Sequence, residues 1–333
     1  MAKTRIALVG SETLLGKELE EVLKGRTKAA ITTFSAAGEG NFGESEGEAV
    51  YVEPFESSSL QNVEAVVFAG SAEGAQKIHS VVMASNSKPL LIDCTGLLES
   101  QPEARIVAPL VNESDTLLGG LLEVAHPAAA ALTLVLARLR RALSIRQTIV
   151  QIFEPASEQG HRGVSELHRQ TTNLLSFKPL DKEVYDAQLS FNLLSQYGEE
   201  GKAKLAAAEQ RIERHVASLI SQTGLKVPMP SIRVIGAPVF HGYSLSIWME
   251  FETALDVSLL TGALASAQIE VRGPNEDAPN SVDVAGQSGL IAGDIRIDRN
   301  NARAAWFWVV GDNLRLTADA VADLIARLEV TVQ

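Results

Sequence analysis

The segment HPAAAA, residues 126–131, joins a short turn to an apolar helical pattern that continues to Arg141. Many enzymes place a nucleophile at such a helix start, because the helix dipole and the free backbone N–H groups stabilise a thiolate there. Residues 128–131 are all alanine, so none of these side chains can attack a substrate. The segment therefore indicates either an ordinary helix start or an active site that has lost its nucleophile.

Three other residues have side chains suited to acid–base or nucleophilic chemistry. Glu154 ends a strand-like run, and it can act as a general base in an apolar site or pair with an arginine. His241 lies two residues before Tyr243, so in a strand both side chains point to one side, roughly 6–7 Å apart. His241 is a candidate base, and its simplest role is an ordinary hydrogen bond in a strand-end loop. Cys94 follows a predicted strand; without a cationic neighbour or a helix N-terminus it packs as a small apolar residue.

The histidine pattern predicts no metal site. His161 and His168 lie seven residues apart on an expected helix, without a carboxylate partner at ligand spacing. His126 precedes Pro127 and is most simply a turn residue.

The composition excludes several classes of function. The 333 residues, 46% hydrophobic and 21% charged, are typical of a folded chain of about two domains. A formal net charge of −12 argues against binding to nucleic acid or to an anionic membrane, because both surfaces repel it. The N-terminal residues show no apolar signal region, and the apolar runs are too short to span a membrane. Together with a single cysteine, which excludes an internal disulfide, these features indicate a cytoplasmic protein.

The first half of the chain alternates strand-like runs with helical patterns. Such alternation predicts a parallel sheet covered by helices on both faces. Gly25 is expected to cap the first helix, and the Gly/Glu-rich segment 38–48 is expected to be a solvated surface loop. The strand-like runs are 4–10, 29–36, 63–71 and 88–96, and the helical patterns are 15–25 and 72–85.

The second half has fewer, longer elements. Residues 148–155 and 243–252 are strand-like, and helical patterns surround 166–175, 204–221 and 317–328. These elements predict an α+β second domain with an antiparallel or mixed sheet. In the run 243–252 one face is expected to be buried and the other less fully covered, because Tyr243, Leu245, Ile247, Met249 and Phe251 alternate with Ser244, Ser246, Trp248 and Glu250.

The first strand ends in a glycine turn, LVGSETLLGKEL. Gly10 and Gly16 suit a dinucleotide-binding turn, in which the backbone approaches a pyrophosphate at the helix N-terminus, but Thr13 replaces the expected middle glycine. Glu12 adds a carboxylate, which within about 4 Å of a phosphate charge costs roughly 4 kcal/mol at an effective dielectric near 20. Gly10, Thr13 and Gly16 are therefore the candidate cofactor-binding residues, and NAD or NADP is expected to bind only weakly.

Many collinear segments resemble bacterial aspartate-semialdehyde dehydrogenases. LVGSETLLGKEL is similar to the family's VGATGxVGxEL, HPAAAA lies where the family has N-P-N-C-S-T, and FEPASEQGHRGVSELHRQT (153–171) matches YQAVSGAGxxxxxELxxQT without a gap. Further matches are SAAGE (35–39), LLIDCTGLLES (90–100), APLVN (108–112), QLSFNLLSQ (188–196), APVFHGYS (237–244), VDVAG (282–286), AGDIRID (292–298) and WVVGDNLR (308–315).

The resemblance implies a fold, a division into domains and an assembly. It implies an N-terminal Rossmann-type dinucleotide-binding domain, residues 1–127 with 314–333. It also implies an α+β catalytic and dimerisation domain, residues 128–313. Since members of the family dimerise through the second domain, a homodimer is expected.

The resemblance also implies that the family's chemistry has been removed. The family reduces an acyl phosphate to an aldehyde with a dinucleotide cofactor, through a thioester on a cysteine that corresponds to Ala129. The family's active-site glutamine corresponds to Glu154, its substrate-binding arginine to Gly236, and its catalytic histidine to Tyr243. Removal of one member of a catalytic unit typically costs several decades in rate.

The phosphate-binding groups have changed as well. The arginine that holds the acyl phosphate corresponds to Glu99, and the lysine that follows the family's DNLR segment corresponds to Leu316. The groups that hold the 2′-phosphate of NADP correspond to Ser35, Ala36 and Glu39. Usg-type proteins keep the fold while departing at such positions, and this chain resembles them.

Two hypotheses follow. The first is a non-catalytic homologue that acts as a dimeric binding or regulatory protein for an unidentified small-molecule ligand. The second is an oxidoreductase of altered chemistry that binds NAD(H) rather than NADP(H), with Glu154 or His241 as the acid–base group.

Overall fold

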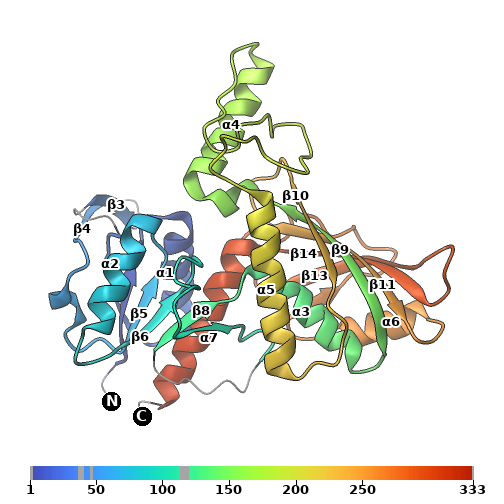
Figure 1. Cartoon of the computed structure of the whole chain (residues 1–333), viewed down its shortest axis with the longest axis horizontal. Helices are drawn as coiled ribbons and strands as arrows, with labels where there is room; N and C mark the ends of the chain where they lie inside the picture. The colour runs from blue at the N-terminus through green and yellow to red at the C-terminus, as the bar shows by residue number, and fades with distance from the viewer. Residues whose placement is uncertain (1–2, 37–40, 46–47, 113–119, 332–333) are drawn as a thin grey trace. The chain divides into compact units, whose positions relative to one another are not determined.

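The computed structural model forms two compact units. Their boundaries are Met1–Ala125 with Thr317–Gln333 for the first unit and His126–Leu316 for the second (Figure 1). The domain limits expected from the sequence stay a prediction. The described residues are 3–36, 41–45, 48–112 and 120–331.

The first unit is built on a six-stranded sheet in which every neighbouring pair is parallel. This confirms the parallel sheet that the alternation of strand and helix patterns predicts. In the sheet the order is β2-β1-β5-β6-β8-β7. The strands are β1 Arg5–Val9, β2 Ala30–Phe34, β5 Ala65–Phe68, β6 Leu90–Asp93, β7 Ala104–Val107 and β8 Leu121–Val124.

Helices cover both faces of this sheet because successive strand side chains point to opposite sides. Ile6 and Leu8 of β1 pack in a cluster with helices α1 (Leu14–Arg26) and α7 (Asn313–Thr331). Ala7 and Val9 pack in a second cluster with α2 (Ala72–Met83) and the short helix η1 (Ser57–Leu60). The two clusters are the core of the unit.

Two local predictions in the first unit are wrong. Gly25 lies inside α1, and Thr27 caps the helix instead: its backbone N–H and its hydroxyl both donate to the carbonyl oxygen of Leu23, so no left-handed glycine is needed. The segment 38–48 is not a loop throughout. Strands β3 (Asn41–Ser45) and β4 (Glu48–Val52) pair antiparallel, because their backbone groups can bond to each other whatever the polarity of the side chains.

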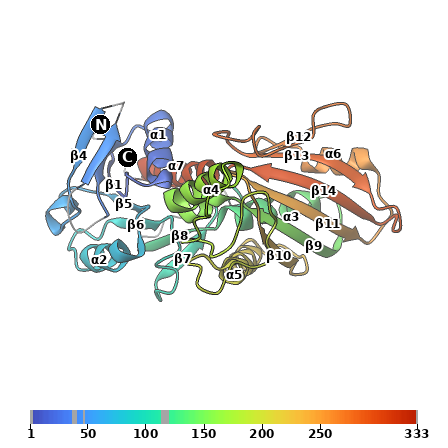
Figure 2. The same cartoon turned by 90° about the horizontal axis from the view of Figure 1, so that it is seen from above.

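The second unit contains a mixed six-stranded sheet, which the sequence also predicts. Figure 2 shows its strands side by side in the order β10-β9-β11-β14-β13-β12. The pairs β10–β9 and β12–β13 are parallel and the other pairs are antiparallel. The strands are β9 Ile145–Glu154, β10 Ser231–Gly236, β11 Tyr243–Phe251, β12 Ile269–Val271, β13 Leu290–Ile297 and β14 Ala304–Gly311.

One face of this sheet is covered and the other is half exposed, as the alternation in β11 predicts. The odd-numbered residues from Tyr243 to Phe251 are buried, and the even-numbered residues between them are half-buried. Helices α3 (Pro127–Arg140), α5 (Leu205–Thr223) and α6 (Val257–Leu264) pack on the sheet, with α3 and α5 side by side (Figure 1). After β9, the short helix η2 (Ala156–Gln159) leads into α4 (Gly160–Leu175).

The glycine turn between β1 and α1 brings two backbone segments unusually close. A Cβ atom at Gly16 would lie 2.0 Å from the carbonyl oxygen of Gly10, which itself has a φ of +94°. Only glycine fits both positions without movement of the backbone.

A matched pair of substitutions in α1 tests this close approach. Gly16→Ala should destabilise the protein by about 1–3 kcal/mol or more, because the new methyl group meets backbone atoms. Gly25→Ala should be neutral or stabilising by about 0.5–1 kcal/mol, because nothing lies within 4 Å of its Cβ position. Thermal unfolding followed by circular dichroism measures both. Equal stability of the two variants would contradict the account.

Candidate functional site

The N-terminus of α3 is held by its own capping residue. His126 is the N-cap, and its Nδ1 accepts a hydrogen bond from the Ala128 N–H at 3.2 Å. Ala129, the position that the resemblance assigns to the nucleophile, is fully buried in the first turn. The helix start therefore offers a methyl group where the family has a thiol.

His126 is also the centre of a buried polar cluster in the second unit. Since Nδ1 accepts, the proton of a neutral ring lies on Nε2. That atom is 3.2 Å from Glu158 Oε1 and 3.3 Å from the Tyr243 hydroxyl oxygen. The backbone N–H of His126 donates to Nδ1 of His215 at 2.8 Å. The cluster thus joins α3 to η2, β11 and α5.

Glu154, at the end of β9, lies in the same cluster. Its Oε1 accepts hydrogen bonds from the Tyr197 hydroxyl at 3.3 Å and from Gln159 Nε2 at 3.5 Å. Its Oε2 is buried without a hydrogen-bond partner, and the residue is only 1% exposed. A carboxylate in this position is costly, because part of its charge is unsolvated and unpaired.

Tyr197 fills the space beside Gly236, where the resemblance expects an arginine. A Cβ atom at Gly236 would lie 2.6 Å from Cε1 of the tyrosine ring and 2.7 Å from its hydroxyl oxygen. A longer side chain therefore fits at this position only if the tyrosine moves away.

Glu154 and Glu158 respond to burial in opposite ways. Burial, together with the negative charge of Glu158, raises the pKa of Glu154 to about 8, although hydrogen bonds from Tyr197 and Gln159 act against the shift. Burial also acts to raise the pKa of Glu158, but His126 and Arg211 outweigh it and lower that pKa to about 2. At neutral pH the two carboxyl groups therefore share one proton, on Glu154, and one negative charge, on Glu158.

The tyrosines of the cluster are hydrogen-bond donors rather than nucleophiles. Burial, followed by the charges of Glu158 and Glu154, raises the pKa of Tyr243, and burial and Glu154 likewise raise the pKa of Tyr197. Both hydroxyls stay protonated over the physiological range. The cluster can hold or move a proton at Glu154, whereas its hydroxyl groups cannot attack an aldehyde.

The structure brings some of the predicted residues together and leaves others apart. Glu154 and Tyr243 are in the cluster, and Gly236 borders it through Tyr197. His241 lies in the loop before β11, where its Nδ1 is buried and has no hydrogen-bond partner. In the first unit, burial and then the charges of Asp93 and Glu123 raise the pKa of Cys94, so its thiol is not activated.

Four members of the cluster were missed or misjudged from the sequence. His126 is far more than a turn residue. Glu158 could have been noticed, because in a match without gaps it places a carboxylate where the family's SGAG segment has its first glycine. His215 had a weaker one, since it lies on the apolar stripe of α5 with Ile212 and Val216. Tyr197 had none, because only the tertiary structure brings it to Gly236.

The glycine turn of the first unit does not fit the 2′-phosphate of NADP. Thr13 Oγ1 accepts from the Gly16 N–H at 2.9 Å and so caps α1 internally. Glu12 Oε1 accepts from the Ala36 N–H at 3.2 Å and from the Ser35 hydroxyl at 3.3 Å, and Glu12 Oε2 is buried and has no hydrogen-bond partner among the described residues. An anion at the end of β2 would face this carboxylate. Glu39 lies outside the described residues.

Among the described residues, no group of three or more histidine, cysteine, aspartate or glutamate side chains is placed to hold a metal ion. None of the helices in the same part of the chain is both long and apolar enough to cross a membrane.

A parallel sheet covered by helices, followed by a mixed sheet that carries the polar cluster, defines a two-domain α/β protein of dehydrogenase type. Residues 136–316, more than half of the chain, match the family described as "Semialdehyde dehydrogenase, dimerisation domain". The chain belongs to the aspartate-semialdehyde dehydrogenase family. The first unit is accordingly of the Rossmann type.

The similar proteins include both Usg-like and dehydrogenase relatives. A "USG-1 protein homolog" of Azotobacter vinelandii is 30% identical over 97% of both chains, and another from Pseudomonas aeruginosa is also 30% identical, over 97% of this chain and 96% of its own. The solved structure of a probable aspartate-semialdehyde dehydrogenase from Pseudomonas aeruginosa has a TM-score of 0.83 and 29% identity, and covers 99% of each chain. Aspartate semialdehyde dehydrogenase II from Vibrio cholerae, at 21% identity and a TM-score of 0.78 over 100% of this chain and 99% of its own, shares the fold.

The raised pKa of Glu154 predicts a pH dependence of stability. Between the ordinary glutamate value of 4.5 and about 8, only the folded chain holds this proton, so the free energy of unfolding falls as pH rises. The slope approaches about 1.4 kcal/mol per pH unit and ends above the folded pKa. Glu158 is ionised in both states over this window and adds no slope.

Glu154→Gln, which cannot ionise, should remove most of this slope and be more stable than the wild-type protein at the alkaline end. Urea unfolding from roughly pH 6 to pH 8.5 measures the effect. Glu252→Gln, a change at an exposed carboxylate of the same unit, is the control and should keep the wild-type slope. An identical slope in wild type and Glu154→Gln would refute a buried proton at Glu154.

Proposed function

We propose that this protein is a member of its family without aspartate-semialdehyde dehydrogenase activity, and that it acts as a dimeric binding or regulatory protein. The observation that carries the proposal is the filled cluster at the start of α3. Ala129 supplies no nucleophile, and Tyr197 takes the space beside Gly236.

The charge of the cluster supports the same conclusion. Aspartate semialdehyde carries a carboxylate, and the acyl phosphate carries a further anionic group. Glu158 is ionised and already pairs with the groups that stabilise a negative charge here, His126 and Arg211, and Glu154 adds a second, protonated carboxyl group where the family has a neutral amide. An anionic substrate would have to displace Glu158 from these two groups.

A second candidate is an oxidoreductase of altered chemistry, which one observation favours. Glu154 has a pKa of about 8 and an unpaired Oε2, so near neutral pH it can give or take a proton. In the first unit Glu12 could accept a hydrogen bond from the ribose hydroxyl of NAD but repels the phosphate of NADP. Such an enzyme would transfer hydride without a covalent intermediate.

An activity assay tests the first candidate against the second. The purified protein should show no phosphate-dependent oxidation of aspartate semialdehyde above background with NAD or NADP, and Ala129→Cys alone should not restore it, because Tyr197 and the carboxyl groups remain. An active member of the family run alongside is the positive control. A rate above background that falls on His241→Ala or Glu154→Gln would overturn the proposal and favour the altered enzyme, as would micromolar binding of NAD by calorimetry.

The half-exposed sheet face of the second unit supports a homodimer. Trp248 and Trp306, paired across β11 and β14, both donate their Nε1–H to Asp298 Oδ2, at 2.9 and 3.0 Å. The helices of its own unit cover the opposite face of the sheet, so a second copy of the chain is the expected cover for this one. Symmetric pairing of two copies is the commonest arrangement. Its other apolar members are Ile149, Phe153, Ile235 and Trp308.

The assembly should be a dimer at micromolar concentration that persists when salt is raised from roughly 0.1 M to 1 M, because apolar burial is not screened as surface charge is. An obligate interface of this kind buries on the order of 2,000 Å² or more. Trp306→Asp places a charge on the face and should shift the sedimentation velocity profile to the monomer. Val330→Asp, at an exposed position on α7, should leave the dimer intact. A stable wild-type monomer would refute the homodimer.

A further inference from the structure

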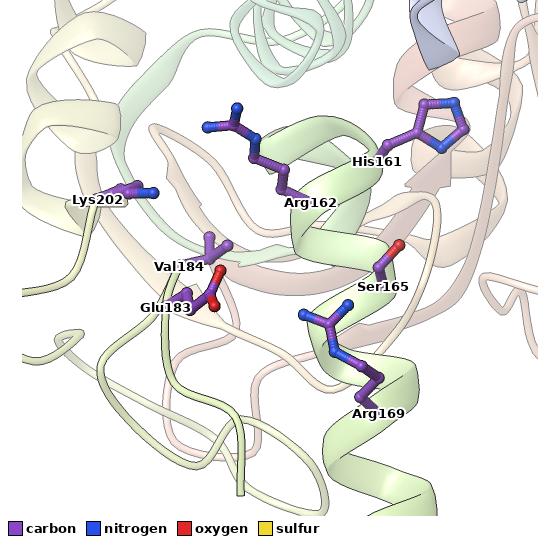
Figure 3. Close-up of a pocket in the computed structure, with 7 residues that line it drawn as sticks. All are labelled: His161, Arg162, Ser165, Arg169, Glu183, Val184 and Lys202. Carbon is purple, nitrogen blue, oxygen red and sulfur yellow. The ribbon is translucent and has the colours of Figure 1, made fainter.

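A second feature of the second unit lies outside the buried cluster. A cavity of about 400 Å³ opens between α4 and the segment that follows it (Figure 3). Arg162, Ser165 and Arg169 line it from α4, at helical spacing that places them on one face. Val184 and Lys202 line it from the opposite side.

The walls of this cavity are held by buried side chains. Glu166 is fully buried, and its two carboxylate oxygens accept from the backbone N–H groups of Val184 at 2.6 Å and Tyr185 at 3.3 Å. The Ala203 N–H donates to the Val184 carbonyl at 3.1 Å, which fixes the neighbouring Lys202 beside the cavity. The cavity is therefore formed before any ligand arrives.

Gln170 supplies the other half of this support. Its Nε2 donates to the carbonyl oxygens of Asp181 and Ala187, and its Oε1 accepts from the N–H groups of Leu189 and Ser190. Glu166 and Gln170 both belong to the retained ELxxQT segment. Their task in the structure is to pin residues 181–190 against α4.

The cavity is rich in positive charge although the chain carries a net charge of −12. Figure 3 shows Arg162 and Lys202 directed toward the same opening, and no ion pair or hydrogen bond involves either side chain among the described residues. Arg169 bonds Asp181 through Nε at 2.6 Å, which leaves its two terminal nitrogens for another acceptor. Glu183 is the one carboxylate among the lining residues, so the cationic side chains of the lining outnumber it and favour an anion at the opening.

We propose that this cavity is a binding site for a small molecule that carries a phosphate group, held by Arg162, Lys202 and Arg169. The cations approach from α4 and from the opposite segment, so they suit an anion with oxygens in several directions. A carboxylate presents two oxygens in one plane and is matched by a single arginine. The volume is in the range of small-molecule sites, roughly 300–1,000 Å³.

Glu183 lowers the affinity of this site for an anion, so its substitution should change the affinity in the opposite direction to the substitution of a cation. Its carboxylate lines the same cavity, between Val184 and Arg169 in Figure 3. Removing this charge should strengthen the binding of an anion, whereas removing a cation should weaken it. Damage to the fold would weaken binding in every variant.

Isothermal titration of the full-length protein with inorganic pyrophosphate, at low ionic strength, tests the site. We expect saturable binding of one anion per chain. Arg162→Ala and Lys202→Ala should each weaken binding about tenfold or more, the effect of losing one charge-assisted hydrogen bond, and Glu183→Gln should strengthen it by about threefold or more. Lys178→Ala, at an exposed position of the same segment that does not line the cavity, should bind as the wild type does.

Several results would overturn the proposal. They are a lack of saturable binding, equal weakening by Lys178→Ala, no gain in Glu183→Gln, or citrate binding as tightly as pyrophosphate. Because the site is separate from the cluster at α3, Glu154→Gln should leave pyrophosphate binding unchanged. The inference goes beyond the proposed loss of catalysis and does not depend on it.

Discussion

The contact between His126 and Glu158 sets the character of the second unit. The imidazole caps α3 with one nitrogen and faces the carboxylate of Glu158 with the other. The start of α3 and the charge of Glu158 therefore depend on one side chain. This contact lets Glu158 stay ionised inside the protein. Burial, together with this ionised carboxylate, raises the pKa of Glu154 and the pKa of Tyr243. An isolated buried carboxylate without such a partner would be protonated instead.

The cluster explains how the fold accommodates alanine at position 129 and glycine at position 236. The helix start, whose dipole would favour a thiolate, is still present. The N–H of Ala128 donates to His126, and the methyl group of Ala129 is buried. The ring of Tyr197 fills the space that a side chain at position 236 would otherwise occupy. These substitutions form a well-packed arrangement, in which the polar atoms mostly bond to each other. Among the described residues Glu154 Oε2 is buried without a hydrogen-bond partner, and this atom is the reason why a proton-transfer function stays a second candidate.

Retained and altered residues have different physical tasks. Glu166 and Gln170 satisfy backbone groups of the segment beside α4, and Gly10 and Gly16 allow two backbone segments to meet. Such residues serve the fold, so they are needed whether or not a reaction takes place. The positions at which the resemblance places the family's reactive groups have no such task in the fold, and both sheets form with Ala129 and Gly236 in place.

The sequence by itself determined the parallel sheet of the first unit, the mixed sheet of the second and the buried face of β11, because strand and helix periodicity records which side chains avoid water. By resemblance it also predicts that Ala129 occupies the family's nucleophile position, and this stays a prediction. The end of α1 and the β3–β4 hairpin were mispredicted, because a threonine can replace a glycine cap and backbone pairing can order a polar segment. Only the tertiary structure decided which residues surround Glu154. Tyr197, His126 and Glu158 come from segments far apart in the chain, and a pKa depends on the neighbours that folding provides.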